Sequence, residues 1–239
     1  MRQTKYIMSK GLAFSEEKDM EKLRRFSLKG WHVSDFKFMG YSLEKGESSD
    51  YIYNVDYRSL KEQEEEEYFD FFSSSGWTHV ASEANIHLFR AHPGTKPIYT
   101  DQETTVEKYR RPSSSIKNFA ISLVLLTVLM WVGVIISTGL LNSVLIILAA
   151  ILSIITVPTV WTAIAAYSNQ WKAEGRRGLV NLAKTIPFLF SLLIIIMLFV
   201  IVPDSAVRFL ASMIIGAIAL PTAIWVIMSI YCKTRGKRA

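Results

Sequence analysis

The feature that most constrains this chain is a run of 54 consecutive residues without formal charge, between Lys117 and Lys172. A helix rises about 1.5 Å per residue, so one helix of that length would be roughly twice as long as the apolar core of a bilayer is thick. The run must therefore fold back on itself, and Gly139 and Asn142 near its middle favour a turn there. The predicted helices cover residues 118–138 and 143–169.

Two further apolar segments predict helices at 185–202 and 207–231. A buried helix of a soluble protein can be equally apolar, but four such segments in succession favour a membrane protein. We therefore expect residues 118–232 to form an all-α bundle of four transmembrane helices, followed by a basic tail at 233–239.

The basic residues around these helices predict the orientation. Twelve of them lie before the first helix, between the second and third, or in the tail, whereas the other two loops carry only Arg208. Because cytoplasmic loops are enriched in Lys and Arg, both termini are expected in the cytoplasm and the lipid bilayer is the expected partner. The residues expected at the membrane surface are Arg110, Arg111, Lys117, Lys172, Arg176, Arg177, Lys233 and Arg235.

Residues 1–92 are charged and rich in aromatic residues, and their pattern predicts short strands and two helices, the first with Ser15 as its N-cap. The pattern repeats at an offset of 46 residues, which places Phe26, Gly30 and Trp31 on Phe72, Gly76 and Trp77. In each unit the glycine is expected to end the helix in a left-handed cap. We expect an α+β domain, a tandem βαββ repeat that forms one antiparallel sheet with two helices on one face.

Residues 93–117 separate this domain from the membrane segments. The segment contains Pro93, Pro97 and Pro112, and a run of serines follows the last of these. Proline and serine in this density predict a linker.

The N-terminal domain carries aromatic residues together with a few carboxylates, a combination that suits an apolar cation or a protein partner. The candidate ligand- or partner-binding residues are Trp31, Tyr41, Glu44, Tyr53, Asp56 and Trp77. The alternative interpretation is that these rings fill the core beneath the two helices.

Motifs for catalysis and for metal or cofactor binding are missing from the sequence. It contains no phosphate-binding loop, dinucleotide fingerprint or nucleophile elbow, so we expect no enzyme, no catalytic residue and no cofactor. The four histidines, expected at surface or edge positions, do not have the spacing of a helical metal site. The acidic run Glu64–Glu67 is expected to be a solvated first turn of a helix. The positive net charge lies beside apolar segments, which argues against direct nucleic-acid binding.

Several stretches of the N-terminal domain resemble a bacterial family known as domain of unknown function 2812. They are 29–33 (KGWHV), 40–46 (GYSLEKG), 51–57 (YIYNVDY) and the glutamate-rich helix that ends at Gly76-Trp77. The resemblance covers about residues 4–92. It implies a cytoplasmic domain followed by a few membrane helices in the bacterial cytoplasmic membrane. Such genes often lie beside PadR-like regulators, which implies a cytoplasmic transcriptional regulator or another membrane protein as partner.

These observations favour a non-enzymatic multi-pass membrane protein whose cytoplasmic domain binds a ligand or partner, as a regulatory or envelope-stress accessory factor. The alternative is a transport, export or immunity factor that acts through the helical bundle. The alternative predicts that Pro158 and Pro221, each followed by a threonine, matter for function. The regulatory hypothesis predicts that the N-terminal domain is essential.

Overall fold

The computed structural model describes residues 3–201 and 203–235 of the chain. Internal contacts divide it into two units. One unit holds the residues up to Thr100 together with those from Phe188 onward, and the other holds Asp101–Pro187. Residues 236–239 of the predicted basic tail lie outside the described residues.

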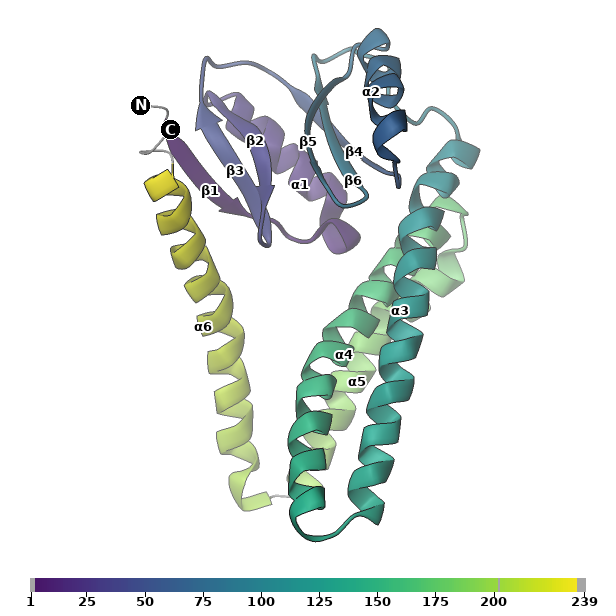
Figure 1. The fold of residues 1–239 in the computed structure, drawn as a ribbon, viewed down its shortest axis with the longest axis vertical. Coiled ribbons are helices and arrows are strands. Elements are labelled where there is room, and N and C mark those ends of the chain that lie inside the picture. Colours follow the sequence, from purple (N-terminus) through teal and green to yellow (C-terminus); the bar gives the residue numbers. More distant parts are fainter. Residues whose placement is uncertain (1–2, 202, 236–239) are drawn as a thin grey trace. The chain divides into compact units, whose positions relative to one another are not determined.

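The N-terminal domain has the element order β-α-β-β twice (Figure 1). The first set is β1 (Thr4–Met8), α1 (Leu12–Ser27), β2 (Trp31–Lys37) and β3 (Gly40–Lys45). The second set is β4 (Ile52–Tyr57), a 3-10 turn (Glu62–Glu64) that leads into α2 (Glu65–Ser74), β5 (Thr78–Glu83) and β6 (Ile86–Ala91).

Within the described residues the strands form two antiparallel sheets of three strands, ordered β1-β3-β2 and β4-β6-β5, so the expectation of one sheet is wrong. The edge strands β2 and β5 lie near each other. Each of them has a register shift, between Val33 and Asp35 in β2 and between His79 and Ala81 in β5. Such bulges twist an edge and interrupt its ladder of hydrogen bonds, which disfavours pairing between the two sheets.

The two helices were expected on one face of a sheet, but they lie on different faces. Neighbouring residues of β6 point to opposite faces, and Leu88 joins a core with Leu23 of α1, whereas Phe89 joins a second core with Phe72 of α2. The second sheet is therefore covered by α2 on one face and by α1 with residues of the first sheet on the other.

The left-handed glycines after α1 and α2 agree with the sequence expectations, whereas the N-cap of α1 is Gly11 and not Ser15. Ser15 has non-helical backbone angles (φ −154°, ψ 46°), so the regular helix starts directly after it, although the element begins at Leu12. Gly30 and Gly76 have φ values of 71° and 83°, which confirms the left-handed conformation. A Cβ atom at Gly30 would also lie 2.6 Å from the carbonyl oxygen of Gly46, so this position requires glycine.

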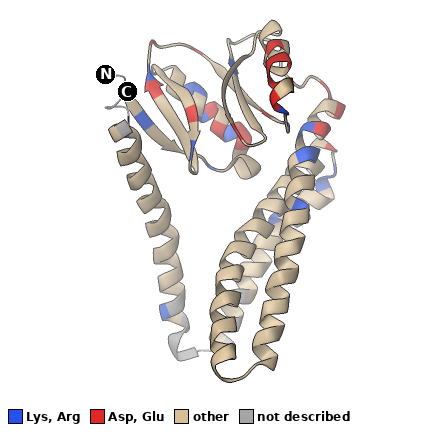
Figure 2. Cartoon of the chain, viewed as in Figure 1, with Lys and Arg blue, Asp and Glu red and all other residues tan. Residues whose placement is uncertain are grey.

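Four long helices follow: α3 (Gln102–Ile136), α4 (Gly139–Ala173), α5 (Arg177–Ile201) and α6 (Pro203–Arg235). Among the described residues, three helical segments are long and apolar enough to cross a membrane: 102–136, 139–173 and 210–234. Figure 2 shows how long stretches of these helices carry no charged residue.

Most of the predicted linker is helical, because α3 begins at Gln102 and continues through Pro112. The Asp101 side chain caps the helix by accepting a hydrogen bond from the Thr104 N–H at 2.8 Å. Pro112 has no N–H for the carbonyl four residues earlier, yet the helix continues through it. The Ser113 hydroxyl has one hydrogen to donate, and it lies 2.9 Å from the Arg110 carbonyl oxygen and 2.6 Å from the Gln170 amide oxygen. Proline and serine therefore predicted a break that the structure does not contain at 102–117.

The predicted turn between the first two membrane segments is present but shorter, since α3 ends at Ile136 and α4 begins at Gly139. The side-chain amide of Asn142 donates to the Val134 carbonyl at 2.6 Å and to the Ser137 carbonyl at 3.1 Å. Asn142 thus satisfies carbonyls at the end of α3 that have no partner within the helix.

Small buried residues line the contact between α3 and α4. They recur every seven residues: Ser113, Ala120 and Thr127 on α3, and Ala149, Thr156 and Ala163 on α4. The Thr127 and Thr156 hydroxyl oxygens are 2.7 Å apart, and the Ser113 hydroxyl lies 2.6 Å from the Gln170 amide oxygen. The seven-residue period and these bonds define an antiparallel, coiled-coil-like hairpin.

Candidate functional site

Three of the aromatic candidates are core residues. Tyr41 and Tyr53 are buried together in the core that α1 shares with both sheets, and Trp77 is buried in the core beneath α2. The Trp77 indole N–H donates to the Lys96 carbonyl at 2.9 Å. Burial raises the pKa of the Tyr41 hydroxyl above its ordinary value, and the neighbouring Asp19 carboxylate raises it further. These three rings pack inside the domain and do not line an open platform.

Trp31 is half-buried at the edge of the first sheet. The ammonium groups of Lys5 and Lys45 lie 5.7 Å and 5.2 Å from its ring centre, within the range of cation–π contacts. Glu44, the first candidate carboxylate, lies on β3 opposite His32. Two lysines of the chain itself thus lie close to the Trp31 ring, where the predicted cationic ligand would bind.

Asp56, the second candidate carboxylate, is only 4% exposed and ties three segments of the domain together. It accepts hydrogen bonds from the hydroxyl groups of Tyr68, at 2.5 Å, and of Tyr99. Its Oδ1 also accepts the Tyr57 N–H at 2.7 Å. A buried carboxylate with this many donors connects β4, α2 and the segment after β6. The structure therefore separates the six candidates: Tyr41 and Tyr53 lie in one core and Trp77 in the other. Trp31 lies on the edge strand β2, Glu44 on the central strand β3, and Asp56 in a buried polar cluster.

Two carboxylates that the sequence analysis did not single out are also buried. Glu16 accepts a hydrogen bond from the Tyr57 hydroxyl at 2.8 Å. Asp19 accepts the Lys10 N–H at 3.0 Å and the Tyr41 hydroxyl at 3.4 Å. Both lie in α1, within the regular part of the helix that follows Ser15.

The histidines of the second sheet form a chain of hydrogen bonds through Ser82. His87 is buried, contrary to the expectation of an edge or surface position, and its Nε2–H donates to the Arg58 carbonyl at 2.9 Å. In the neutral ring Nδ1 must then accept, and it lies 2.7 Å from the Ser82 hydroxyl. His79 Nε2 lies 2.7 Å from the same oxygen. Burial lowers the pKa of His79, and the neighbouring His87 lowers it further.

These histidines do not form a metal centre within the part of the chain that the structure describes. That part contains no group of three or more His, Cys, Asp or Glu side chains arranged to hold a metal ion. The Phe69 ring stacks on the His79 ring at 3.9 Å between centres, so the histidine chain packs beneath α2. Its geometry ties β5 to β6 and holds one serine hydroxyl between two imidazoles.

The basic residues expected at the membrane surface gather at one end of the α3–α4 hairpin and its exit, away from the turn at 137–138. Those with described side chains there are exposed: Arg110, Arg111, Lys117, Lys172, Arg176 and Arg177. Glu107 pairs with Arg111 at 3.2 Å, and Glu174 pairs with Arg176 at 2.9 Å. Lys233 is exposed near the end of α6, whereas the Arg235 side chain lies outside the described ones.

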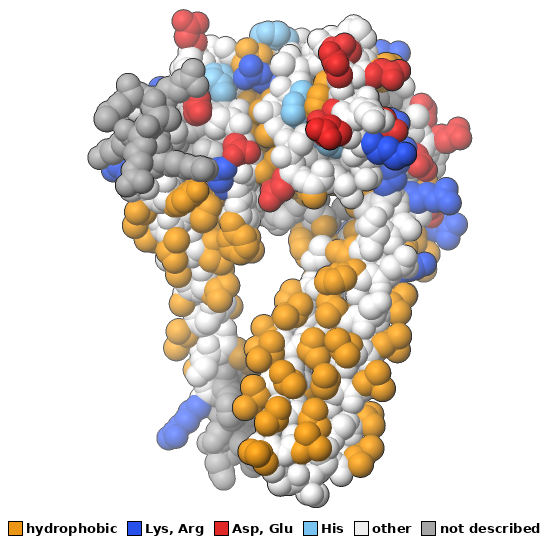
Figure 3. All heavy atoms as spheres, in the orientation of Figure 1, with side chains coloured by type: hydrophobic (Ala, Val, Ile, Leu, Met, Phe, Trp, Pro, Cys, Tyr) orange, Lys and Arg blue, Asp and Glu red, His pale blue; other side chains and the backbone are white. Residues whose placement is uncertain are grey.

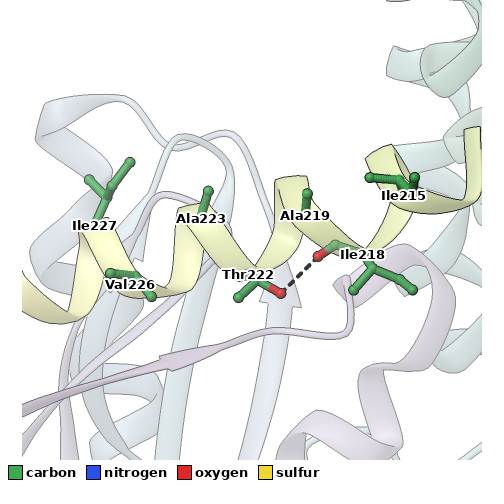
Figure 4. Close-up of a pocket in the computed structure, with 7 residues that line it drawn as sticks. All are labelled: Ile215, Ile218, Ala219, Thr222, Ala223, Val226 and Ile227. Atoms are coloured by element: carbon green, nitrogen blue, oxygen red, sulfur yellow. Dashed lines mark hydrogen bonds between the residues drawn. The ribbon is translucent and has the colours of Figure 1, made fainter. Parts of the chain in front are cut away.

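One face of α6 forms a shallow apolar groove. Figure 4 shows seven side chains along this face, from Ile215 to Ile227. Thr222 lines the groove, but its hydroxyl is already hydrogen-bonded, because it donates to the Ile218 carbonyl at 2.7 Å. Thr159 of α4 makes the same bond to Ile155 at 2.8 Å. The groove is therefore an apolar surface with almost no free polar groups.

Comparison with known protein families gives a match over part of the chain. Residues 15–121 match the model of a family described as "Protein of unknown function (DUF2812)". No curated protein and no solved structure matches the chain. The match covers the N-terminal domain from α1 onward and the first part of α3.

Proposed function

Residues 15–121 belong to the DUF2812 family of unknown function, and from the architecture of the chain we propose a non-enzymatic regulatory protein of the bacterial cytoplasmic membrane. In this proposal the N-terminal domain lies in the cytoplasm and binds a protein or small ligand. The apolar helices anchor the domain at the bilayer and respond to its occupancy.

The continuity of α3 is the observation that carries this proposal. The helix starts at its Asp101 cap, directly after the domain, and runs without interruption to Ile136. Its polar first part, residues 102–117, is about 24 Å long, and the apolar part that follows is long enough to span a bilayer core. A helix is a stiff spacer, whereas a flexible linker would absorb a movement of the domain. This connection suits a protein in which one region reports to the other.

We further infer that α5 is a fourth membrane helix. The part of α5 from 185 to 201 contains no charged residue and is about 26 Å long, close to the thickness of a bilayer core. The basic residues at the open end of the α3–α4 hairpin support a cytoplasmic position for that end and for both termini. In a Cys232→Ser background, a membrane-impermeant thiol reagent added outside should label Thr138→Cys and leave Lys172→Cys unlabelled. Labelling of Lys172→Cys from outside would reverse the orientation.

A tandem repeat is the simplest origin for the N-terminal domain. Both halves share the β-α-β-β order, the strand order within the sheet, a bulge in the strand after the helix and a left-handed glycine. These shared features support duplication of a single unit.

The test is capture of partners by cross-linking in the membranes of the native host. Three baits are compared: the full chain, residues 1–100, and residues 101–239. Circular dichroism first establishes that residues 1–100 are folded. The proposal expects a cytoplasmic regulator or signalling protein to be captured by the full chain and by residues 1–100.

The alternative, transport, export or immunity through the helical bundle, makes the opposite prediction. Membrane proteins would then be captured by the full chain and by residues 101–239, and deletion of the N-terminal domain would leave the captured set unchanged. That outcome would contradict the regulatory proposal.

A further inference from the structure

The loop between β2 and β3 presents two large apolar side chains to solvent. Lys37 pairs with Gly40, so Phe38 and Met39 are the two loop residues. They are 63% and 54% exposed. Phe14, near the start of α1, is 49% exposed and follows the end of β1, where Met8 pairs with Gly40. Adjacent large apolar side chains that are exposed mark contact surfaces, whereas single ones are common.

The backbone of this loop is held from two sides. The Tyr6 hydroxyl donates to the Phe38 carbonyl at 2.8 Å, and the Ser9 N–H donates to the Met39 carbonyl at 2.9 Å. A Cβ atom at Gly40 would lie 2.2 Å from the Ile7 carbonyl oxygen, so β1 and β3 approach closely here. The end of β1 lies beside this hairpin in Figure 1. The loop is thus a rigid support from which two apolar side chains project.

The residue type at position 39 is not the one that the turn conformation favours. Met39 has a φ of 56°, a left-handed conformation that glycine and asparagine adopt more easily. The equivalent loop of the second sheet lies between Glu83 and Ile86 and consists of Ala84 and Asn85. In that loop the left-handed residue is Ala84 (φ 52°), the first of the two loop residues and not the second, and both residues are small or polar. A two-residue turn in this domain therefore does not require large apolar side chains.

We propose that Phe38 and Met39 insert into the interface of an anionic lipid bilayer and hold the N-terminal domain against the membrane. The proposal rests on the membrane attachment proposed above, which keeps this domain close to a bilayer. Lys10, exposed next to Ser9, adds a charge that anionic headgroups attract. Because the helices already tether the domain, a weak interaction is sufficient to hold this contact.

The test uses the full chain, in a Cys232→Ser background, reconstituted into vesicles of phosphatidylethanolamine and phosphatidylglycerol. A polarity-sensitive fluorophore is attached at Met39→Cys, and the vesicles contain spin-labelled lipids as quenchers. The matched control carries the fluorophore at Phe71→Cys, because Phe71 of α2 is 67% exposed and belongs to the second sheet's side of the domain. The expected result is a blue-shifted, lipid-quenched emission at position 39 and a water-like, unquenched emission at position 71.

Three outcomes would overturn the inference. A water-like emission at position 39 would show that the loop stays in solution. A blue shift without lipid quenching would show that the loop packs against protein, either a second copy or another part of this chain. Equal quenching at positions 39 and 71 would show that the domain contacts the bilayer without a specific site.

A second measurement separates insertion of these side chains from mere proximity. The fluorophore is moved to Lys10→Cys, and Phe38→Ser with Met39→Ser is compared with Phe71→Ser. Lipid quenching should be lost in the first variant and kept in the second; retained quenching in both would overturn the inference. Co-flotation of the chain with vesicles tests the anchoring by the helices separately. Failure to float contradicts the proposed membrane attachment, whereas flotation without quenching contradicts this inference alone.

Discussion

The N-terminal domain and the α3–α4 hairpin are packed with opposite kinds of side chain. In the domain, large residues such as Tyr41, Trp77 and Phe89 are buried. In the hairpin, the buried residues other than Lys108 are Ser, Ala and Thr, and many large apolar side chains are exposed, with Ile135 81% exposed. Figure 3 shows apolar side chains along the outer surfaces of the helices.

The difference fits the proposed arrangement, in which the domain lies in water and the hairpin in lipid. In water, burial of a large apolar side chain is the main driving force for folding. In lipid the surroundings are as apolar as leucine, so helices associate through small residues that allow close approach and through hydrogen bonds between them. The interior of each region therefore indicates its environment, which the following predictions test.

The largest effect is expected for Trp77→Ala. This ring is buried, and its removal should lower the free energy of unfolding of the domain by about 3–5 kcal/mol. Trp31→Ala should cost about 1 kcal/mol, because that ring is already half in solvent. Scanning calorimetry of the full chain in detergent measures both changes. Equal losses for the two variants would contradict the different environments of the two tryptophans.

In the hairpin, enlarging a buried small residue should have the next largest effect. Ala149→Leu forces the helices apart and should cost about 1–3 kcal/mol of hairpin stability. Ala150→Leu, whose side chain is exposed, is the matched control. The readout is the yield of a disulfide between cysteines substituted for Thr127 and Thr156, whose hydroxyl oxygens are 2.7 Å apart. A similar yield in both leucine variants would mean that the contact is not tightly packed.

A smaller effect is expected from the hydrogen bond between the two threonines. Thr127→Val should destabilise the hairpin by about 0.6 kcal/mol, the average for such bonds in membrane proteins. Thr159→Val removes a hydroxyl bonded within its own helix and serves as the control. A double-mutant cycle with Thr156→Val, measured by unfolding in mixed micelles, isolates the pair. Additive losses would show that the two hydroxyls do not interact.

The smallest effect concerns the pH dependence of the second sheet. Folding lowers the pKa of His79 from its ordinary value of 6.5, so the unfolded chain binds a proton more readily. The free energy of unfolding is therefore highest above pH 6.5, where His79 is neutral in both states, and it falls as the pH decreases through the folded pKa. NMR titration measures that pKa, and melting temperatures measured against pH give the slope. His79→Gln should make the melting temperature depend less on pH. An unchanged dependence would show that another group causes it.

The existence of the long helices could be predicted from the sequence, because an apolar segment in lipid must satisfy its backbone hydrogen bonds internally. The ends of these helices were harder to predict. The start of α3 at Gln102 is fixed by the Asp101 cap, and the helix continues through Pro112 and the serines that predicted a break.

For the candidate binding residues, the sequence predicted the residue types of the region but not their positions in the fold. Their residue types correctly indicated an aromatic-rich domain, but Tyr41 and Trp77 lie in separate cores and Asp56 is buried. The partners of Asp56 are Tyr68 and Tyr99, which lie 12 and 43 positions away in the chain. Contacts over such separations leave no periodic signal in a single sequence.

The sequence by itself determined the division into a charged, aromatic domain and apolar helices, because both solvent preference and helix length are local properties of the chain. Only the tertiary structure decided that the strands form two sheets, that α1 and α2 lie on different faces, and that Phe38 and Met39 project from a rigid loop. The physical reason is that register, bulges and exposure depend on which strands meet, and that choice is made by the packed fold as a whole.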